Sequence, residues 1–123
     1  MQFKIVRNTL VAIGDFAKSR KGAIRNSLKS WQVVADYLEM TENDIPDKKA
    51  DKTCNLCQLY PACKECPILQ KTGRTQCDGT AYYKYVNARE DFDHAKALRA
   101  AHKMVDLLAS LLDEPPAEKV TPA

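Results

Sequence analysis

The chain has 123 residues, enough for one domain with a modest hydrophobic core, and it carries a net charge of +3 and five cysteines. No run approaches the ~18 apolar residues of a membrane span, and charges stand in the first residues, where a secretory signal needs an apolar stretch. The composition argues against a membrane protein and predicts a protein of the cytoplasm, where disulfides are disfavoured.

Charge alternates in blocks along the chain. Residues 1–30 hold seven Lys/Arg and one acid, and residues 51–89 hold six Lys/Arg and three acids, whereas residues 31–50 and 90–123 each have a net charge of −3. The basic blocks predict a positive surface that meets phosphate or an acidic protein. A solvated surface without a partner is the simpler interpretation, because the pI of about 8.6 lies below the ~9 of a dedicated nucleic-acid domain. The candidate binding residues in the first block are Arg20, Lys21 and Arg25.

The first sixteen residues fit two elements. Phe3 and Ile5 alternate with polar neighbours, as in a short strand. Helical spacing is also present, and we favour a helix on the set Phe3, Val6, Leu10 and Ile13.

A helix over residues 22–40 is the most secure element, and it must end before Pro46, which lacks an N–H donor. Its apolar residues recur at steps of three and four and predict a core stripe of Ile24, Leu28, Trp31, Ala35 and Leu38.

A second helix is expected over residues 88–112, with acidic residues in its first turns, where the helix dipole favours them. Its stripe is Leu98, Ala101, Val105, Leu108 and Leu112, and Phe92 and Ala95 extend it toward the start of the helix. The acids of its first turns are Glu90, Asp91 and Asp93, and Pro115 and Pro116 end it. Residues 1–114 then form a single small α-rich domain, and residues 115–123 form a disordered tail.

Residues 44–86 lack an apolar period, and a stretch of that length needs something else to organise it. Five cysteines stand in its Cys-rich insert, about residues 51–86, with the spacing C-x2-C-x5-C-x2-C-x10-C: Cys54, Cys57, Cys63, Cys66 and Cys77. Each CxxC pair can bring two thiolates to one metal ion, so the spacing predicts a metal site.

Zinc needs four ligands, and two sets of cysteines can supply them. The first is Cys54, Cys57, Cys63 and Cys66, in which the five-residue connection is tight; the second replaces Cys63 with Cys77. Spacing does not choose between them. A [4Fe–4S] cluster is the alternative, because Cys66 is followed by Pro67 as in ferredoxin motifs. A thioredoxin-like pair is disfavoured, since the expected βαβ context is missing.

Tyrosines and cations follow the last cysteine. They could form a stacking platform for single-stranded nucleic acid, although packing of two of the three tyrosines is the favoured interpretation. The candidate binding residues here are Arg74, Tyr82, Tyr83 and Lys84, with Tyr85 the third tyrosine.

No catalytic motif is present, so the sequence gives no support for an enzyme. His94 and His102 are eight positions apart on the second expected helix and are interpreted as surface or packing residues.

The stretch "CNLC…CKECPILQKTGRTQCDGTAYYKY", preceded by the Trp31 helix, resembles a group of small cysteine-rich proteins of phage and prophage type over about residues 22–112. That resemblance implies a phage-associated protein in the cytoplasm of a bacterial host and assigns no activity to any residue. Taken together, the expectation is a mainly α fold: two long amphipathic helices, roughly antiparallel, joined by an irregular metal-bound segment. Structural zinc would hold this binding module, whose partner is a host protein or nucleic acid; the alternative is an iron–sulfur protein with a redox or sensing role. The oligomeric state stays open.

Overall fold

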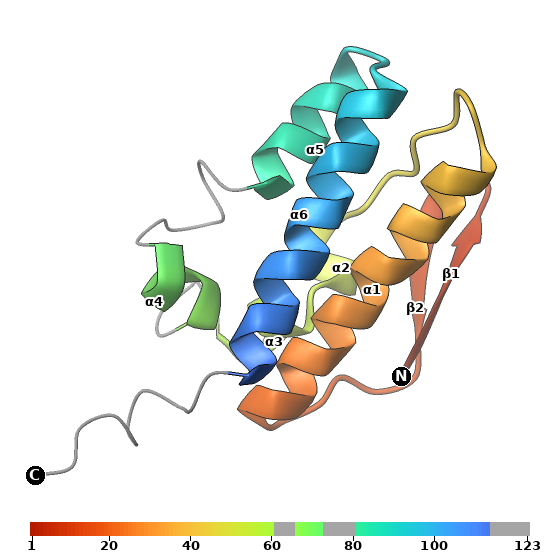
Figure 1. Ribbon diagram of the computed structural model, residues 1–123. Coiled ribbons are helices and arrows are strands. Elements are labelled where there is room, and N and C mark those ends of the chain that lie inside the picture. Colours follow the sequence, from red (N-terminus) through yellow and green to blue (C-terminus); the bar gives the residue numbers. More distant parts are fainter. Residues whose placement is uncertain (61–65, 73–80, 114–123) are drawn as a thin grey trace, which may run out of the picture.

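The computed structural model describes residues 1–60, 66–72 and 81–113, which are mainly α-helical. Two long helices, α1 (Arg20–Met40) and α6 (His94–Asp113), lie side by side and run in opposite directions (Figure 1). A third helix, α5 (Ala81–Glu90), packs on α6. The predicted α-rich class and the antiparallel pair of long helices are confirmed. None of the helices in these ranges is both long and apolar enough to cross a membrane.

The first residues form a β-hairpin, so the helix favoured from the sequence is wrong. Strands β1 (Gln2–Val6) and β2 (Thr9–Ile13) pair antiparallel, and the hairpin packs against α1. The two turn residues, Arg7 and Asn8, have φ of 50° and 59°, as a two-residue type I′ turn requires. Asn tolerates this geometry, and the β-branched residues on both sides favour strand, which outweighs the weak helical spacing.

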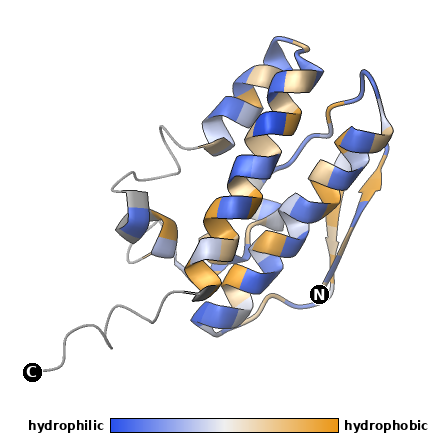
Figure 2. Cartoon of the chain, in the orientation of Figure 1, coloured by the Kyte–Doolittle hydropathy of each residue, from blue (hydrophilic) through white to orange (hydrophobic). Residues whose placement is uncertain are grey.

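Helix α1 starts where Ser19 caps it: the Ser19 Oγ accepts a hydrogen bond from the Gly22 N–H at 3.1 Å. Hydrophobic and hydrophilic residues alternate along α1 and α6 (Figure 2), as expected for helices that bury one side. Trp31 is 3% exposed, which confirms its predicted place in the core. The other fully or nearly buried residues of α1 are Ala23, Ile24, Ser27, Ser30, Val34, Ala35 and Leu38.

The chain after α1 returns along the hairpin. Asp47 forms a parallel bridge with Thr9, because its N–H donates to the Asn8 carbonyl and its carbonyl accepts from the Leu10 N–H, both at 2.8 Å. The Tyr85 hydroxyl donates to the Pro46 carbonyl at 2.5 Å, so α5 holds the same segment from its other side. Residues 45–47 therefore join the hairpin to the helices.

The segment expected to be irregular contains short helices: α2 (Ala50–Thr53), α3 (Asn55–Leu59) and α4 (Pro67–Thr72), with α5 following residues 73–80. Helix α3 packs against α1, and α2 contacts β2. The interpretation of residues 44–86 as lacking regular structure is therefore too broad. These elements are too short to show a periodic apolar pattern, and α3 is held by contacts with α1.

The helix expected over residues 88–112 is interrupted. Helix α5 ends in a Schellman motif, in which the Asp93 N–H donates to the Ala88 carbonyl at 2.9 Å and the Phe92 N–H to the Arg89 carbonyl at 3.2 Å. Phe92 has φ of 55°, a left-handed conformation that reverses the chain. Phe92 and Ala95 are exposed, so their predicted place on the apolar stripe is wrong, because the turn points them away from the core. The Asp93 carboxylate then accepts from the Lys96 N–H at 3.0 Å and caps α6. Glu90, Asp91 and Asp93 were expected in the first turns of a single long helix. Glu90 instead ends α5, and Asp91 and Asp93 lie in the turn between α5 and α6.

Candidate functional site

Cys54 and Cys57 lie at the start of α3. Cys54 is the N-cap residue of this helix, and its Sγ accepts a hydrogen bond from the Cys57 N–H at 3.3 Å. Both side chains are half-buried. A backbone N–H that points at the sulfur of the first cysteine in a CxxC pair favours the thiolate form, which is the form that ligates metals.

The surroundings of Cys54 favour its thiolate. The pKa of Cys54 is lowered to about 6, chiefly by a hydrogen bond from the Cys57 side chain, while burial opposes this by raising the pKa. The positive charge of Lys48, the Cys57 N–H and the Ser27 hydroxyl lower the pKa further. These contacts favour the thiolate of Cys54 at neutral pH, with Cys57 beside it.

Lys48 supplies a buried positive charge to this region. It is only 5% exposed, and its Nζ donates to the Thr53 Oγ1 at 3.2 Å and lies 4.6 Å from the centroid of the Trp31 ring. Lys48 does not stand out in the sequence, because a Lys-Lys pair in an acidic block is typical of an exposed surface. The aromatic ring that accepts this cation comes from α1, seventeen positions earlier in the chain.

Asn55 anchors α3 to the rest of the protein and, like Lys48, was not predicted from the sequence. Its side chain is fully buried. The Oδ1 accepts from the Ala17 N–H and from the Asn26 Nδ2, both at 2.7 Å, and the Nδ2 donates to the Ala17 carbonyl at 3.0 Å. Ser27 of α1 adds a further link, since its Oγ accepts from the Leu56 N–H at 3.4 Å. The residue next to Cys54 therefore fixes the position of the CxxC pair against α1.

The remaining cysteines are only partly placed. Cys66 is 6% exposed and belongs to the hydrophobic core, whereas Cys63 and Cys77 lie outside the described residues. Within residues 1–60, 66–72 and 81–113, three or more His, Cys, Asp or Glu side chains do not gather as a metal site would require. Cys63 and Cys77, two of the five predicted ligands, lie outside these residues. The metal site and the choice of its four cysteines therefore stay predictions.

The tyrosines expected after the last cysteine pack mainly on Trp31. Tyr85 is 1% exposed and meets the Trp31 ring edge-on, with ring centroids 5.1 Å apart; Tyr82 does the same at 6.1 Å. Tyr83 and Lys84 are exposed, and Arg74 lies outside the described part of the chain. Packing by two of the three tyrosines is confirmed, and their partner is Trp31 of α1. The expectation that they also cover the metal knuckles stays a prediction. A binding role for Tyr83 and Lys84 stays a prediction.

The predicted basic surface lies on the first half of α1. Lys21, Arg25 and Lys29 are exposed at steps of four, about 6 Å apart along the helix axis. Neither Lys21 nor Arg25 forms an ion pair with the described residues, and the Lys29 Nζ donates to the Met1 carbonyl at 3.1 Å. Arg20, the remaining predicted residue, is half-buried.

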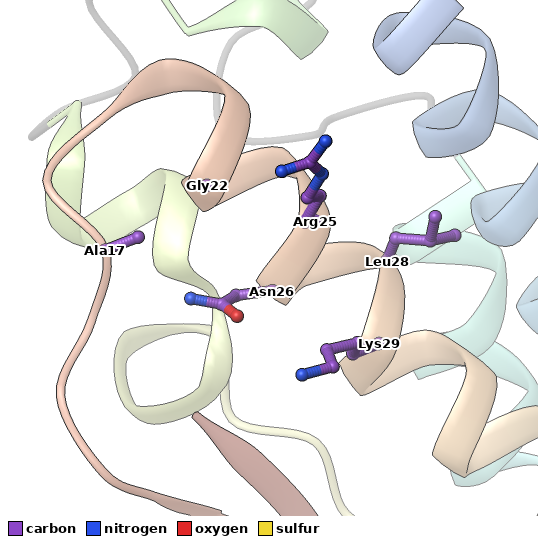
Figure 3. Close-up of a pocket in the computed structure, with 6 residues that line it drawn as sticks. All are labelled: Ala17, Gly22, Arg25, Asn26, Leu28 and Lys29. Atoms are coloured by element: carbon purple, nitrogen blue, oxygen red, sulfur yellow. The ribbon is translucent and has the colours of Figure 1, made fainter.

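A shallow hollow of about 370 Å³ opens on this surface (Figure 3), lined by Ala17, Gly22, Arg25, Asn26, Leu28 and Lys29. Gly22 allows the segment before α1 to pack closely on the helix, because a Cβ at this position would lie 2.8 Å from the Ala17 Cβ and 2.9 Å from the Ser19 Oγ. Asn26 and Lys29 point to the side on which Ala17 lies, whereas Arg25 extends away from the helix (Figure 3).

The charges of α1 are arranged against its dipole. The first turn contains Arg20 and Lys21 and no acid, and the last turn contains Glu39 and no base. Cations near a helix N-terminus and anions near its C-terminus are each unfavourable by some ~0.3–1 kcal/mol. Helix stability therefore does not explain this charge arrangement.

The two histidines pair with α1, as expected of surface or packing residues. The His102 Nε2 lies 2.9 Å from the Glu39 Oε1, and the His94 Nε2 lies 3.4 Å from the Thr41 Oγ1. Both contacts fasten α6 to the last turn and the C-terminal end of α1.

Comparison with models of known protein families, with curated proteins and with solved structures found no match. The resemblance to small phage-type proteins stays a prediction.

Proposed function

We propose that this protein is a small binding module whose cysteine segment is held by a structural zinc ion. The observation that carries the proposal is the pair Cys54 and Cys57: two adjacent sulfurs at the start of a short helix, with the pKa of Cys54 lowered to about 6. Zinc takes thiolates in a tetrahedral set, and a CxxC turn supplies two of its four ligands.

The surroundings suit a zinc–thiolate centre. Four thiolates and one Zn²⁺ carry a net negative charge, which the nearby Lys48 would partly balance, and the Ser27 hydroxyl and the Cys57 N–H would donate to the Cys54 sulfur. Cys66, which is buried just before α4, would supply a third thiolate. Cys63 or Cys77 would complete the set.

Metal content and the visible spectrum of the full chain test this proposal, using protein purified without oxygen and without a chelating column. We expect one zinc per chain and no colour. Each cysteine is then replaced singly by serine, and we expect four of the five variants to lose zinc and the fifth to retain it. About four irons with matching sulfide would instead identify a [4Fe–4S] cluster and overturn the structural-zinc proposal. Absence of any metal would overturn both.

The basic surface of α1 is the proposed contact surface, and its partner is anionic: a nucleic acid or the acidic surface of a protein. The support is the row of exposed cations, Lys21, Arg25 and Lys29, in positions that the helix dipole disfavours. Single-stranded DNA is the first probe. Binding should weaken steeply as salt rises, because each neutralised phosphate releases counterions. Arg25→Glu should lower the affinity, and Lys103→Glu, which makes the same charge change at an exposed site on α6, should lower it less.

A further inference from the structure

The end of the molecule opposite the basic surface is acidic. The last turn of α1 and the α5–α6 turn meet there, joined by the contact between Thr41 and His94. The exposed acids at this end are Glu39, Glu42, Asp44, Glu90, Asp91 and Asp93. They outnumber the cations that lie there, Arg7, Arg89 and Lys96. Helix α1 is about 30 Å long, so charges of opposite sign stand about that far apart on one small domain.

An exposed aromatic residue projects from this acidic end. Phe92 is 90% exposed, and Asp91 and Asp93 flank it. Its φ of 55° is a conformation that glycine adopts without strain and phenylalanine does not. A large apolar side chain that is both solvent-exposed and strained contributes little to the fold, so its packing energy remains available for a contact with another molecule. Met40, 81% exposed, lies at the same end.

The basic hollow on α1 complements this projection in shape and in charge. It is concave where Phe92 is convex, and Leu28 and Ala17 give it apolar walls. Arg25 and Lys29 stand on its rim, where the carboxylates that flank Phe92 would meet them. A guanidinium beside an aromatic ring adds a cation–π attraction. Each copy thus carries both halves of a single contact.

We propose that the chain self-associates head to tail: Phe92 of one copy, with Asp91 and Asp93 on either side, enters the hollow between Arg25 and Lys29 of a second copy. This inference names one occupant of the basic surface. It rests on the proposed contact role of that surface and is independent of the metal. The contact joins two different patches, so it repeats from copy to copy and builds a chain of molecules, which is a closed ring if the rotation between copies closes and open if it does not. A contact made by one aromatic side chain and its two neighbours buries far less than the ~1,200 Å² of a stable interface, so the association is weak.

Sedimentation equilibrium of the full, reduced chain tests the proposal. At ~0.01 M salt, where charges act over ~30 Å, the average mass should rise from 13.8 kDa as the concentration increases. At ~1 M salt, where the screening length is ~3 Å, the mass should fall toward that of one chain. Phe92→Gly removes the projecting ring without adding backbone strain, and Arg25→Glu reverses a charge on the rim of the hollow. Each variant alone should be monomeric, whereas Lys103→Glu, the control, should associate as the native chain does.

Mixing the two variants gives the sharpest result. The Arg25→Glu chain keeps an intact Phe92, and the Phe92→Gly chain keeps an intact hollow, so an equal mixture can form one contact. We expect a dimer and no larger species. A native chain that stays monomeric, or a mixture that gives no dimer, would overturn the proposal. Association lost in Phe92→Gly but unchanged in Arg25→Glu would mean that two Phe92 ends pair with each other, which also overturns it. If the chain is monomeric yet binds single-stranded DNA through Arg25, the self-association is wrong and the contact role of the basic surface stands.

Discussion

Removing the Asn55 side chain should destabilise the protein strongly. The buried amide makes three hydrogen bonds, two to the backbone of Ala17 and one to the side chain of Asn26. A hydrogen bond in a protein contributes roughly 1 kcal/mol net, and partners left buried without one cost more. We therefore expect Asn55→Ala to lower the free energy of unfolding by about 3 kcal/mol, or Tm by about 12 °C for a chain of this size.

Urea unfolding followed by the fluorescence of Trp31, the only tryptophan, measures this loss. Trp31 is buried against α5, so its emission should change when the core opens. Asn26→Ala is the matched control, because it removes one of the three hydrogen bonds and should cost about 1 kcal/mol. All proteins are compared at the same zinc content. If Asn55→Ala costs no more than Asn26→Ala, the amide does not anchor α3 and the account of how the CxxC pair is positioned is wrong.

Three further changes test other parts of the structure. Tyr85→Phe removes the hydrogen bond to the buried Pro46 carbonyl and should cost about 1–2 kcal/mol in urea unfolding. Burial raises the pKa of Tyr85, so the folded state keeps the phenol protonated while the unfolded chain ionises; stability should fall as the pH rises above ~10, and less steeply in the Phe variant. Phe92→Gly should raise the free energy of unfolding by about 0.5 kcal/mol, because relief of the left-handed strain exceeds the entropy that glycine adds to the unfolded chain. Thermal unfolding measures this gain, and Phe92→Ala, which keeps the strain, should not show it. A chelator should increase hydrogen exchange in α3 by far more than in α1 and α6, and equal exchange before and after chelation would contradict a structural metal.

The local pattern of apolar residues was sufficient to predict that two long helices form the core. The apolar residues of α1 recur at a helical period, and burial of one side follows from that period, which is why Trp31 and Leu38 were correctly placed in the core. The cysteine spacing likewise singled out the segment that contains Cys54 and Cys57, since each CxxC turn is a local feature. The charge blocks also follow from the sequence alone.

The predictions from sequence were wrong at two turns, where a helical spacing of apolar residues hid a reversal of the chain. The hairpin at residues 2–13 depends on Arg7 and Asn8 adopting positive φ, and the break between α5 and α6 depends on Phe92 doing the same. Neither turn contains glycine, the residue that usually indicates a positive φ. The apolar stripe continues across the second break, so periodicity could not reveal it.

Only the tertiary structure decided what surrounds the cysteine pair. Lys48 is buried because Trp31 and Thr53 meet it from different parts of the chain, and Asn55 is satisfied by Ala17 and Asn26, which stand 38 and 29 positions earlier. The free-energy cost of burying a charge or an amide is offset only when other groups interact with it. The packing of α3 on α1 determines which groups those are. The sequence determined which residues could ligate a metal and which helices form the core. The packing of those helices decided that Lys48 and Asn55, which the sequence presents as ordinary polar residues, lie beside Cys54 and hold the start of α3 in place.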